Sequence, residues 1–298
     1  MPKCKRRFRV GLVAAVTASG ALAATAAAAT IEGGNGPDRL VGTHDADVVH
    51  ARGGHDRVRA LGGDDRVLAG DDNDVVRAGA GNDDVNGERG FDRLFGAAGN
   101  DVLQGWQGPD RLWGGLGDDT LTGDVPEAGD RISPDRLWGG AGADALRGGD
   151  GRDVLHGGPD NDTDLGQDGD DLMIGGPGDD SQDGGTGNDR IFANAGRDTT
   201  EGGPGDDVLW ALIRFDVTGP VDLEGDIVRG GDGNDRIRTR DGEQDIVSCG
   251  PGVDVARLDT VDVIEGASTT TPDGDCERVK RAAPRPGEDA EERSQSPE

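Results

Sequence analysis

Aliphatic side chains recur at a fixed interval along most of this chain. Residues 33–122 divide into consecutive nine-residue units, and the eighth place of every unit is Leu or Val, as at Leu94 and Leu103. The same frame covers residues 130–210, and shorter runs of it return around Asp226. A fixed period of this kind is typical of a solenoid, in which each repeat packs on its neighbours in the sequence.

Two polar columns accompany the aliphatic one. In the first run the sixth place is Asp in all ten units, and the fourth place is Gly in eight of them. The two exceptions are Asp45 and Asp72, and after Gly it is Asn and Asp that best tolerate the left-handed backbone region. Each unit is therefore predicted to be a tight turn of six residues, followed by a short strand with its middle side chain pointing inward.

Two units make one coil with two turns and two strands. Stacked coils would form two facing parallel sheets, rising by about 4.8 Å per coil. Asp residues 18 positions apart would then lie one coil apart on the same edge. We therefore expect an all-β, parallel solenoid with a thin inner ladder of aliphatic side chains.

The composition disfavours folding of this architecture, because the chain is rich in Gly and in negative charge and poor in large apolar side chains. The chain has 55 Gly, no Tyr, 3% aromatic residues and a formal charge of −29. At about 25 cal/mol per Å², one aliphatic side chain per unit does not offset the backbone entropy of so Gly-rich a chain. Ladders of Asp add repulsion, so a cation must bind them. The acidic balance also argues against nucleic acid as a partner, since phosphate binding needs clustered basic residues.

Calcium is the cation that suits these turns. It takes 6–8 oxygen ligands, carboxylate and backbone carbonyl alike. Gly-rich turns expose carbonyls and the sixth-place Asp supplies charge. Mg²⁺ demands stricter geometry, and Zn²⁺ prefers Cys or His, which the turns mostly lack.

Several units closely resemble a known repeat. GGLGDDTL (114–121), GGDGRDVL (148–155) and GGDGNDRI (230–237) follow the pattern GGxGxDxUx. This pattern resembles the hemolysin-type, or repeats-in-toxin (RTX), calcium-binding nonapeptide. The resemblance covers about residues 33–257. It implies a parallel β-roll in which multiple Ca²⁺ ions lie between adjacent turns, held by the sixth-place Asp and by turn carbonyls.

The resemblance assigns metal binding to one column of the sequence. The implied Ca²⁺ ligands are Asp38, Asp47, Asp56, Asp65, Asp74, Asp83, Asp92, Asp101, Asp110, Asp119, Asp144, Asp153, Asp162, Asp171, Asp180, Asp189, Asp198, Asp207, Asp235 and Asp254.

The order of segments predicts an exported protein. A basic start is followed by an apolar, Ala-rich stretch with an A-x-A site at Ala27–Ala29, which is typical of a signal peptide cleaved before Thr30. No membrane association is expected after its removal. The expected segments are a signal peptide at 1–29, a first repeat block at 30–122, an insertion at 123–129, a second block at 130–210, an insertion at 211–220, terminal repeats at 221–262, and a disulfide-pinned, disordered tail at 263–298.

One turn departs strongly from the pattern. At 130–135, Asp130 and Arg131 replace the first two glycines and Ser133 replaces the fourth. Pro134 then biases Ser133 toward extended backbone. We expect this turn to be a poor Ca²⁺ site that, with the two insertions, divides the metal ladders into sections.

Two further columns allow more than one interpretation. Asp164, Gln182 and Thr200 take the inward eighth place in alternate units. They form either a polar groove or a local weakness with rotated, half-solvated strands. Aromatic residues take the outward ninth place at the same spacing, which indicates either a surface for sugar, cell wall or a partner, or cross-strand stacking that supports the sheet. The ninth-place residues concerned are Phe95, Trp113, Trp138, His156, Ile174, Phe192 and Trp210.

Only Cys249 and Cys276 remain after signal removal. In an exported protein they suggest one disulfide that ties the tail to the last coil, with two free thiols as the alternative. The segment from Cys249 to Glu277 looks like the ending of many secreted actinobacterial repeat proteins.

No catalytic arrangement stands out. The four His have no paired metal-ligand spacing, no nucleophile elbow is present, and the Gly-rich strings are not followed by a long helix. The sequence therefore predicts a secreted, non-enzymatic, calcium-binding protein with a structural, adhesive or cell-surface role. The alternatives are an enzyme acting on extracellular polysaccharide and a module that binds another protein.

Overall fold

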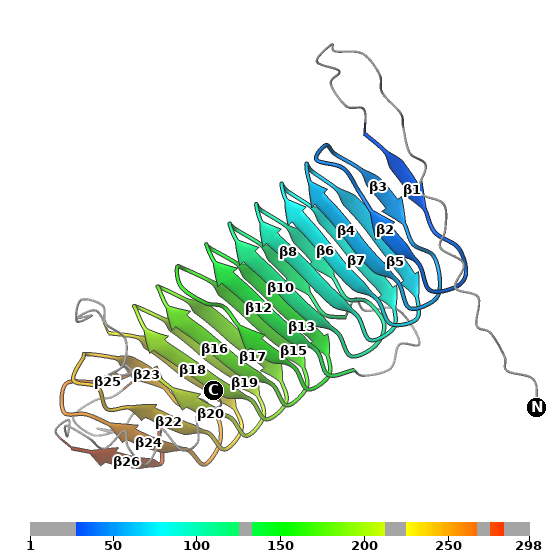
Figure 1. Ribbon diagram of the computed structural model, residues 1–298. Coiled ribbons are helices and arrows are strands. Elements are labelled where there is room, and N and C mark those ends of the chain that lie inside the picture. The colour runs from blue at the N-terminus through cyan, green and yellow to red at the C-terminus, as the bar shows by residue number, and fades with distance from the viewer. Residues whose placement is uncertain (1–27, 125–132, 212–224, 267–274, 283–298) are drawn as a thin grey trace, which may run out of the picture.

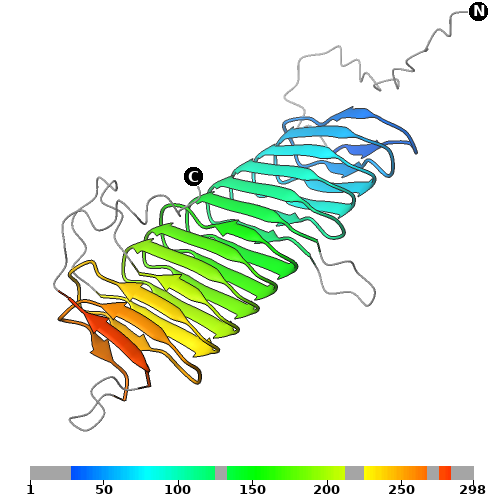
Figure 2. The same cartoon turned by 90° about the horizontal axis from the view of Figure 1, so that it is seen from below.

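The fold is a long parallel β-solenoid, shown in Figure 1 and, turned by 90°, in Figure 2. The computed structural model describes residues 28–124, 133–211, 225–266 and 275–282. Odd-numbered strands form one 13-stranded sheet, sheet A, and even-numbered strands form a second, sheet B. The all-β, two-sheet solenoid predicted from the period is confirmed. The described residues contain no helix long and apolar enough to cross a membrane.

Most strands have three or six residues, because each begins directly after the sixth-place Asp and some continue into the first places of the next turn. Sheet A consists of β1 (Thr30–Glu32), β3 (Val48–His50), β5 (Arg66–Asp71), β7 (Asp84–Arg89), β9 (Val102–Gln104), β11 (Thr120–Thr122), β13 (Ala145–Asp150), β15 (Thr163–Asp168), β17 (Ser181–Thr186), β19 (Thr199–Pro204), β21 (Ile227–Asp232), β23 (Ile246–Ser248) and β25 (Val263–Ile264). Sheet B consists of β2 (Arg39–Val41), β4 (Arg57–Gly62), β6 (Val75–Ala80), β8 (Arg93–Ala98), β10 (Arg111–Leu116), β12 (Arg136–Ala141), β14 (Val154–His156), β16 (Leu172–Pro177), β18 (Arg190–Ala195), β20 (Val208–Trp210), β22 (Arg236–Thr239), β24 (Val255–Leu258) and β26 (Arg278–Arg281).

The register follows the sequence period. Arg93 pairs with Arg111, and Leu94 with Leu112, each 18 residues further on. The eighth-place side chains of both sheets meet inside and are fully buried, as at Leu94, Leu103 and Leu112. Residues at the seventh and ninth places point outward.

Glycine at the fourth place is explained by backbone geometry. Most of these residues have positive φ, such as 152° at Gly169. Asp72 and Asp160, which replace this glycine, keep positive φ of 78° and 81°, as expected from the tolerance of Asp for this conformation. Asp45 is not among the residues with positive φ, so the expectation is wrong at that position.

The first interruption lies inside a turn rather than between two units. The amide N–H groups of Gly123 and Asp124 donate to the carbonyls of Arg147 and Gly148 in the next coil, in the manner of a regular turn. These two residues therefore hold the first places of the turn that ends at Asp135. The expected insertion at 123–129 and restart at Asp130 are wrong in this detail, because main-chain pairing continues for two residues beyond the apparent break.

The tail is more ordered than the sequence suggested. Residues 263–264 form β25 and residues 278–281 form β26, which adds the last strand to sheet B. The prediction of a disordered tail from residue 263 is therefore wrong for these segments, whereas 267–274 and 283–298 lie outside the described residues. The physical reason is that Asp262 and Glu277 each precede an outward residue and an inward Ile264 or Val279, so the pattern persists in weakened form.

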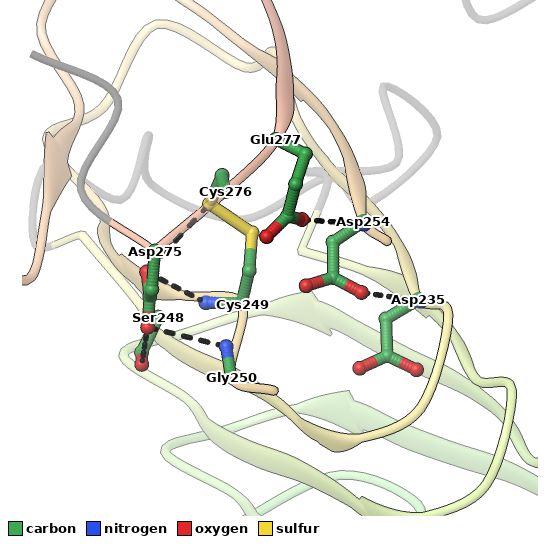
Figure 3. Close-up of a disulfide and its surroundings, with 8 residues drawn as sticks. All are labelled: Asp235, Ser248, Cys249, Gly250, Asp254, Asp275, Cys276 and Glu277. Carbon is green, nitrogen blue, oxygen red and sulfur yellow. Dashed lines mark hydrogen bonds between the residues drawn. A yellow bond between two sulfur atoms is a disulfide. The ribbon is translucent and has the colours of Figure 1, made fainter. Parts of the chain in front are cut away.

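Cys249 and Cys276 form a disulfide (Figure 3). Cys276 lies directly before Glu277 and β26, and Cys249 directly follows β23. The bond therefore joins the last coil to the coil before it, as expected from the pair of cysteines.

The polar strip is buried in the core. Asp164 and Gln182 are aligned one rung apart in sheet A, and Thr200 follows at the next rung. All three are at most 2% exposed, so the interpretation of rotated, half-solvated strands is wrong. Their side-chain polar atoms lack hydrogen-bond partners, and burial raises the pKa of Asp164 well above its usual value.

We expect Asp164→Leu to stabilise the solenoid. The preceding rung already holds Leu146, and replacement removes two buried oxygens that lack hydrogen bonds. The free energy of unfolding in excess Ca²⁺ should rise by about 1–3 kcal/mol, measured by denaturant titration. Thr163→Leu, at the neighbouring exposed position, is the control and should change it by less than about 0.5 kcal/mol. Destabilisation by Asp164→Leu would show that the strip has a required polar role.

Candidate metal centres along the two edges

The sixth-place carboxylates form two continuous ladders, one before each sheet. Each ladder residue immediately precedes a strand, so the strand register fixes its position on the edge. Ladder A precedes sheet A and contains Asp47, Asp65, Asp83, Asp101, Asp119, Asp144, Asp162, Asp180, Asp198, Asp226, Asp245 and Asp262. Ladder B precedes sheet B and contains Asp38, Asp56, Asp74, Asp92, Asp110, Asp135, Asp153, Asp171, Asp189, Asp207, Asp235, Asp254 and Glu277.

One carboxylate oxygen of each rung is used to join coils. The amide N–H of Asp92 donates to Oδ1 of Asp110 at 2.7 Å. The same contact continues across the first interruption, from Asp110 to Asp135 at 2.7 Å, and across the second, from Asp198 to Asp226 at 2.8 Å. Each ladder is therefore an unbroken chain of hydrogen bonds, whereas the expected division of the metal ladders into sections concerns Ca²⁺ occupancy and stays a prediction.

The second carboxylate oxygen, Oδ2, is buried at most rungs without a hydrogen-bond donor. A Cβ added to Gly114 would overlap Oδ2 of Asp119, and the same holds for Gly139 and Asp144. Oδ2 thus faces back into its own turn, beside the first-place glycine. Ladder residues with such an Oδ2 are Asp56, Asp65, Asp74, Asp83, Asp92, Asp101, Asp110, Asp119, Asp135, Asp144, Asp153, Asp162, Asp171, Asp180, Asp189, Asp207, Asp235, Asp245 and Asp254.

Backbone carbonyls add a second set of oxygens to the edges. A Cβ on Gly99 would overlap the carbonyl oxygen of Gly81, one coil earlier, and a Cβ on Gly117 would overlap that of Gly99. The fourth-place carbonyls therefore point along the solenoid axis toward the next turn. Carboxylate and carbonyl oxygens together form the hard donor set that Ca²⁺ prefers.

Burial makes the ionised form of these carboxylates unfavourable without a cation. Burial, the largest cause, raises the pKa of Asp92 to about 9, and the neighbouring Asp110 raises it further. The pKa of Asp135 rises to about 10, again chiefly by burial. The pKa of Asp74 rises to about 7 for the same reason. A divalent cation would remove this penalty by supplying the missing partner for Oδ2, so the residues present fit Ca²⁺.

All twenty Asp residues predicted as ligands lie in the ladders, but they are not equivalent. Oδ2 of Asp38 accepts the amide N–H of Gly34 at 2.7 Å, and Oδ2 of Asp47 accepts that of Thr43 at 2.6 Å. The first rungs thus have a local donor that most later rungs lack, although Oδ2 of Asp262 accepts from Thr239 Oγ1 and from the amide N–H of Asp259. Their role as ligands, like that of the other eighteen, stays a prediction.

Sequence reasoning left five ladder members out of the ligand set. Asp135 was excluded because its turn looked poor, yet it has the same Oδ1 contact and the same buried Oδ2 as its neighbours. The others are Asp226, Asp245, Asp262 and Glu277, which follow insertions or slips in the frame. The signal that would have found them is an Asp or Glu followed by one residue of any type and then by an aliphatic residue.

The end of ladder A gathers additional carboxylates. Carboxylate oxygens of Asp226, Asp241 and Asp245 lie within 4.8 Å of one another. Asp241 comes from the turn after β22, which is one residue longer than the regular turn. The extra residue therefore places a third carboxylate against two ladder residues.

The architecture and its edges define a class of protein: a parallel β-solenoid with a buried Asp ladder and Gly-rich turns on each side. The family model described as RTX calcium-binding nonapeptide repeat matches residues 24–58, 59–94, 86–121, 133–164, 165–182, 183–211 and 223–243. These matches cover more than half of the chain, and the chain belongs to this family. The resemblance noted in the sequence is confirmed. The sequence matches no curated protein.

RTX nonapeptide repeats bind Ca²⁺, and the chain is a calcium-binding repeat protein of solenoid form. The family match brings no enzymatic family with it. The edge ladders hold the buried carboxylate and carbonyl oxygens that suit this chemistry, and the assignment of Ca²⁺ to them stays a prediction.

Proposed function

We propose that this protein is exported and that, at neutral pH, it folds only when multiple Ca²⁺ ions occupy both ladders. The observation that carries the proposal is the series of buried Oδ2 atoms without donors. A chain of formal charge −29 with buried, uncompensated carboxylates repels itself, and the thin aliphatic core does not overcome that repulsion. Ca²⁺ binding energy is then folding energy, as in other proteins with metal-dependent folds.

The proposed setting is extracellular. The basic start and apolar stretch before Thr30 favour export, although residues 1–27 lie outside the described part of the chain. The disulfide agrees with an oxidising compartment. Low Ca²⁺ before export would leave the chain open, and Ca²⁺-rich surroundings would fold it into a rigid rod with a structural, adhesive or cell-surface role.

The polysaccharide-acting enzyme is less well supported. Asp164, the one carboxylate of the polar strip that such an enzyme could use, has no exposed surface, so a polymer outside the solenoid does not reach it. The interaction alternative, with a wall polymer or another protein as partner, remains compatible with the outward faces.

Circular dichroism of the chain from Thr30 onward tests coupled folding. In buffer freed of metal at pH 7.5 we expect a disordered spectrum, and addition of Ca²⁺ should produce a β-rich spectrum in a cooperative transition. Mg²⁺ at the same concentration serves as the control, because it demands near-octahedral geometry and keeps its waters. A β-rich spectrum that is unchanged by chelation would refute coupled folding.

A further inference from the structure

The outward face of sheet B is basic, although the protein is strongly acidic. We define the basic face as the seventh- and ninth-place residues of sheet B. Every strand of this sheet except β14, β16 and β20 contributes Arg or Lys, and no described strand contributes Asp or Glu at these places. The basic residues are Arg39, Arg57, Arg59, Arg77, Arg93, Arg111, Arg136, Arg190, Arg236, Arg238, Arg257, Arg278 and Lys280.

Sheet A does not share this feature. Its outward places hold Arg66, Arg147 and Arg229 together with acidic residues, and Arg66 lies 3.7 Å from the carboxylate of Asp84. The acidic residues at these places are Glu32, Asp84, Asp183, Glu201 and Glu265. The concentration of positive charge is therefore specific to the outward face of sheet B and does not follow from the overall composition.

The basic face contains a row of three arginines on β8, β10 and β12. Arg93, Arg111 and Arg136 are aligned in adjacent strands, about 4.8 Å apart along the solenoid axis, and all three are exposed. Like charges directly opposite on neighbouring strands are destabilising. A row of this kind is compensated when an anionic partner lies across it.

A groove runs beside this row. It has a volume of about 720 Å³ and is lined by fifth- to seventh-place residues of consecutive coils. These are chiefly Phe91, Pro109 and Pro134, the ladder B carboxylates that follow them, and the three arginines. Because its lining follows the repeat, the groove extends along the solenoid axis. It suits an extended chain rather than a compact ligand.

The stacked aromatic side chains on the same face argue against a partner that binds by stacking on open rings. Phe95 and Trp113 stack with ring centroids 4.5 Å apart, and Trp113 and Trp138 with centroids 4.9 Å apart. The guanidinium of Arg77 covers the Phe95 ring at 5.2 Å. The rings stack on one another, as the cross-strand interpretation predicted, so they offer edges to the outside. Proteins that bind single-stranded nucleic acid stack the bases on open aromatic faces. The rings inside this stack are covered by their neighbours and do not present such faces.

A duplex also fits poorly. Its phosphates wind around a helical axis, so only a few of them meet a straight row of arginines at once. A linear polymer with a charge on successive residues can follow the row over many coils, and charge-assisted contacts to Arg favour planar carboxylates and sulfates.

We propose that the basic face binds a linear anionic polysaccharide, with its chain along the solenoid axis and its carboxylate or sulfate groups on the arginine row. This inference rests on the proposed function, because Ca²⁺ in ladder B both orders the coils and neutralises the carboxylates directly before the arginines. It adds to the general expectation of a polysaccharide partner the surface that binds it and the negative charge that the polymer carries.

Binding of three polymers with one backbone tests the proposal. Dextran sulfate, carboxymethyl-dextran and unmodified dextran are titrated against the Ca²⁺-saturated protein by calorimetry, with Ca²⁺ in excess over the polymer charge. We expect binding to one or both charged polymers, weakening as NaCl is raised, and none to dextran. The stronger of the two charged polymers identifies sulfate or carboxylate as the ligand group. Binding to neither would overturn the proposal.

Two charge-matched triple variants locate the site. Arg93→Gln, Arg111→Gln and Arg136→Gln together should weaken binding by about tenfold or more. Arg66→Gln, Arg147→Gln and Arg229→Gln on sheet A remove the same charge and should change affinity by less than about twofold. Equal loss in both variants would overturn the assignment to the basic face.

Two further measurements separate the possible outcomes. Tighter binding to duplex DNA or to phosphatidylserine vesicles than to either charged dextran would refute a polysaccharide partner. Circular dichroism of each variant in Ca²⁺ confirms the fold independently. Loss of polymer binding with an intact Ca²⁺-induced spectrum would be an effect on the basic face alone. Absence of that spectrum in the unmodified chain would instead contradict the proposed Ca²⁺-dependent folding.

Discussion

Lowering the pH from 7.5 to 5 should restore β structure to the metal-free chain. Burial raises the pKa of most ladder carboxylates in the folded state, to about 6 at Asp56 and to about 10 at Asp135, against an ordinary value of 3.8. A raised pKa means that the folded state binds protons more tightly than the unfolded state. The stabilising contribution is therefore complete below about pH 4 and is lost as the pH rises through the folded-state values.

The measurement is circular dichroism of the chain in buffers freed of metal, scanned from pH 7.5 to pH 5. In excess Ca²⁺ the spectrum should change little between pH 7.5 and pH 6, because the cation replaces the proton as the partner of the carboxylates. Apparent Ca²⁺ affinity should fall over the same range, since protons compete for the ligands. Order that increases with pH in the absence of metal would show that burial does not dominate the ladders.

Gly169→Ala should destabilise the solenoid severely. Gly169 has a φ of 152°, and an added Cβ would overlap the carbonyl oxygen of Gly151 in the preceding coil. The carbonyl oxygen belongs to the backbone and the added Cβ would be fixed directly to it, so the overlap is relieved only by separating two coils. We expect a loss of about 2–4 kcal/mol in the free energy of unfolding in excess Ca²⁺, measured by denaturant titration.

Gly36→Ala is the matched control for this substitution. Gly36 holds the same fourth place in the first coil, and an added Cβ there would have no neighbour within 4 Å. Its replacement should change stability by less than about 0.5 kcal/mol. Gly36 also lacks the positive φ of Gly169, so similar effects at the two positions would mean that neither contact between coils nor backbone conformation is what requires glycine at this place.

The sequence was sufficient for the architecture because two columns are almost invariant. The aliphatic eighth place defines the inside of the solenoid and Asp at the sixth place defines its edges, so the pairing of Leu94 with Leu112 follows from counting. The buried state of Asp164 and the stacking of Phe95 on Trp113 follow from the same register.

Features that depend on contacts between coils were harder to predict. Gly123 and Asp124 look like part of an insertion, and only their bonds to Arg147 and Gly148 reveal a turn. The final strands were missed because β26 follows Glu277, and Glu replaces Asp there. The carboxylates were expected to be cation ligands alone, whereas Oδ1 of Asp110 accepts the backbone N–H of Asp92.

The basic face was missed because its signal appears only in alternate units. Within a single nine-residue frame, Arg at the seventh place alternates with Val, Thr or Asp, as at Arg93, Val102 and Arg111. Reading the chain with a period of 18 separates the two sheets and reveals the charge on one of them.

The hydrogen bonds of the ladders all run in one direction, and this makes the solenoid a polar rod with two different ends. Each Asp donates its amide to the following coil, and ladder B ends when Asp254 donates to Glu277 (Figure 3). Loss of coils at the C-terminal end would leave an exposed amide N–H that donates to water, whereas loss at the N-terminal end would leave a carboxylate oxygen that accepts from water or binds a cation. The two ends of the rod therefore present different groups, carboxylate oxygens at the start and amides at the finish, and the last coil, pinned by the disulfide, closes the stack.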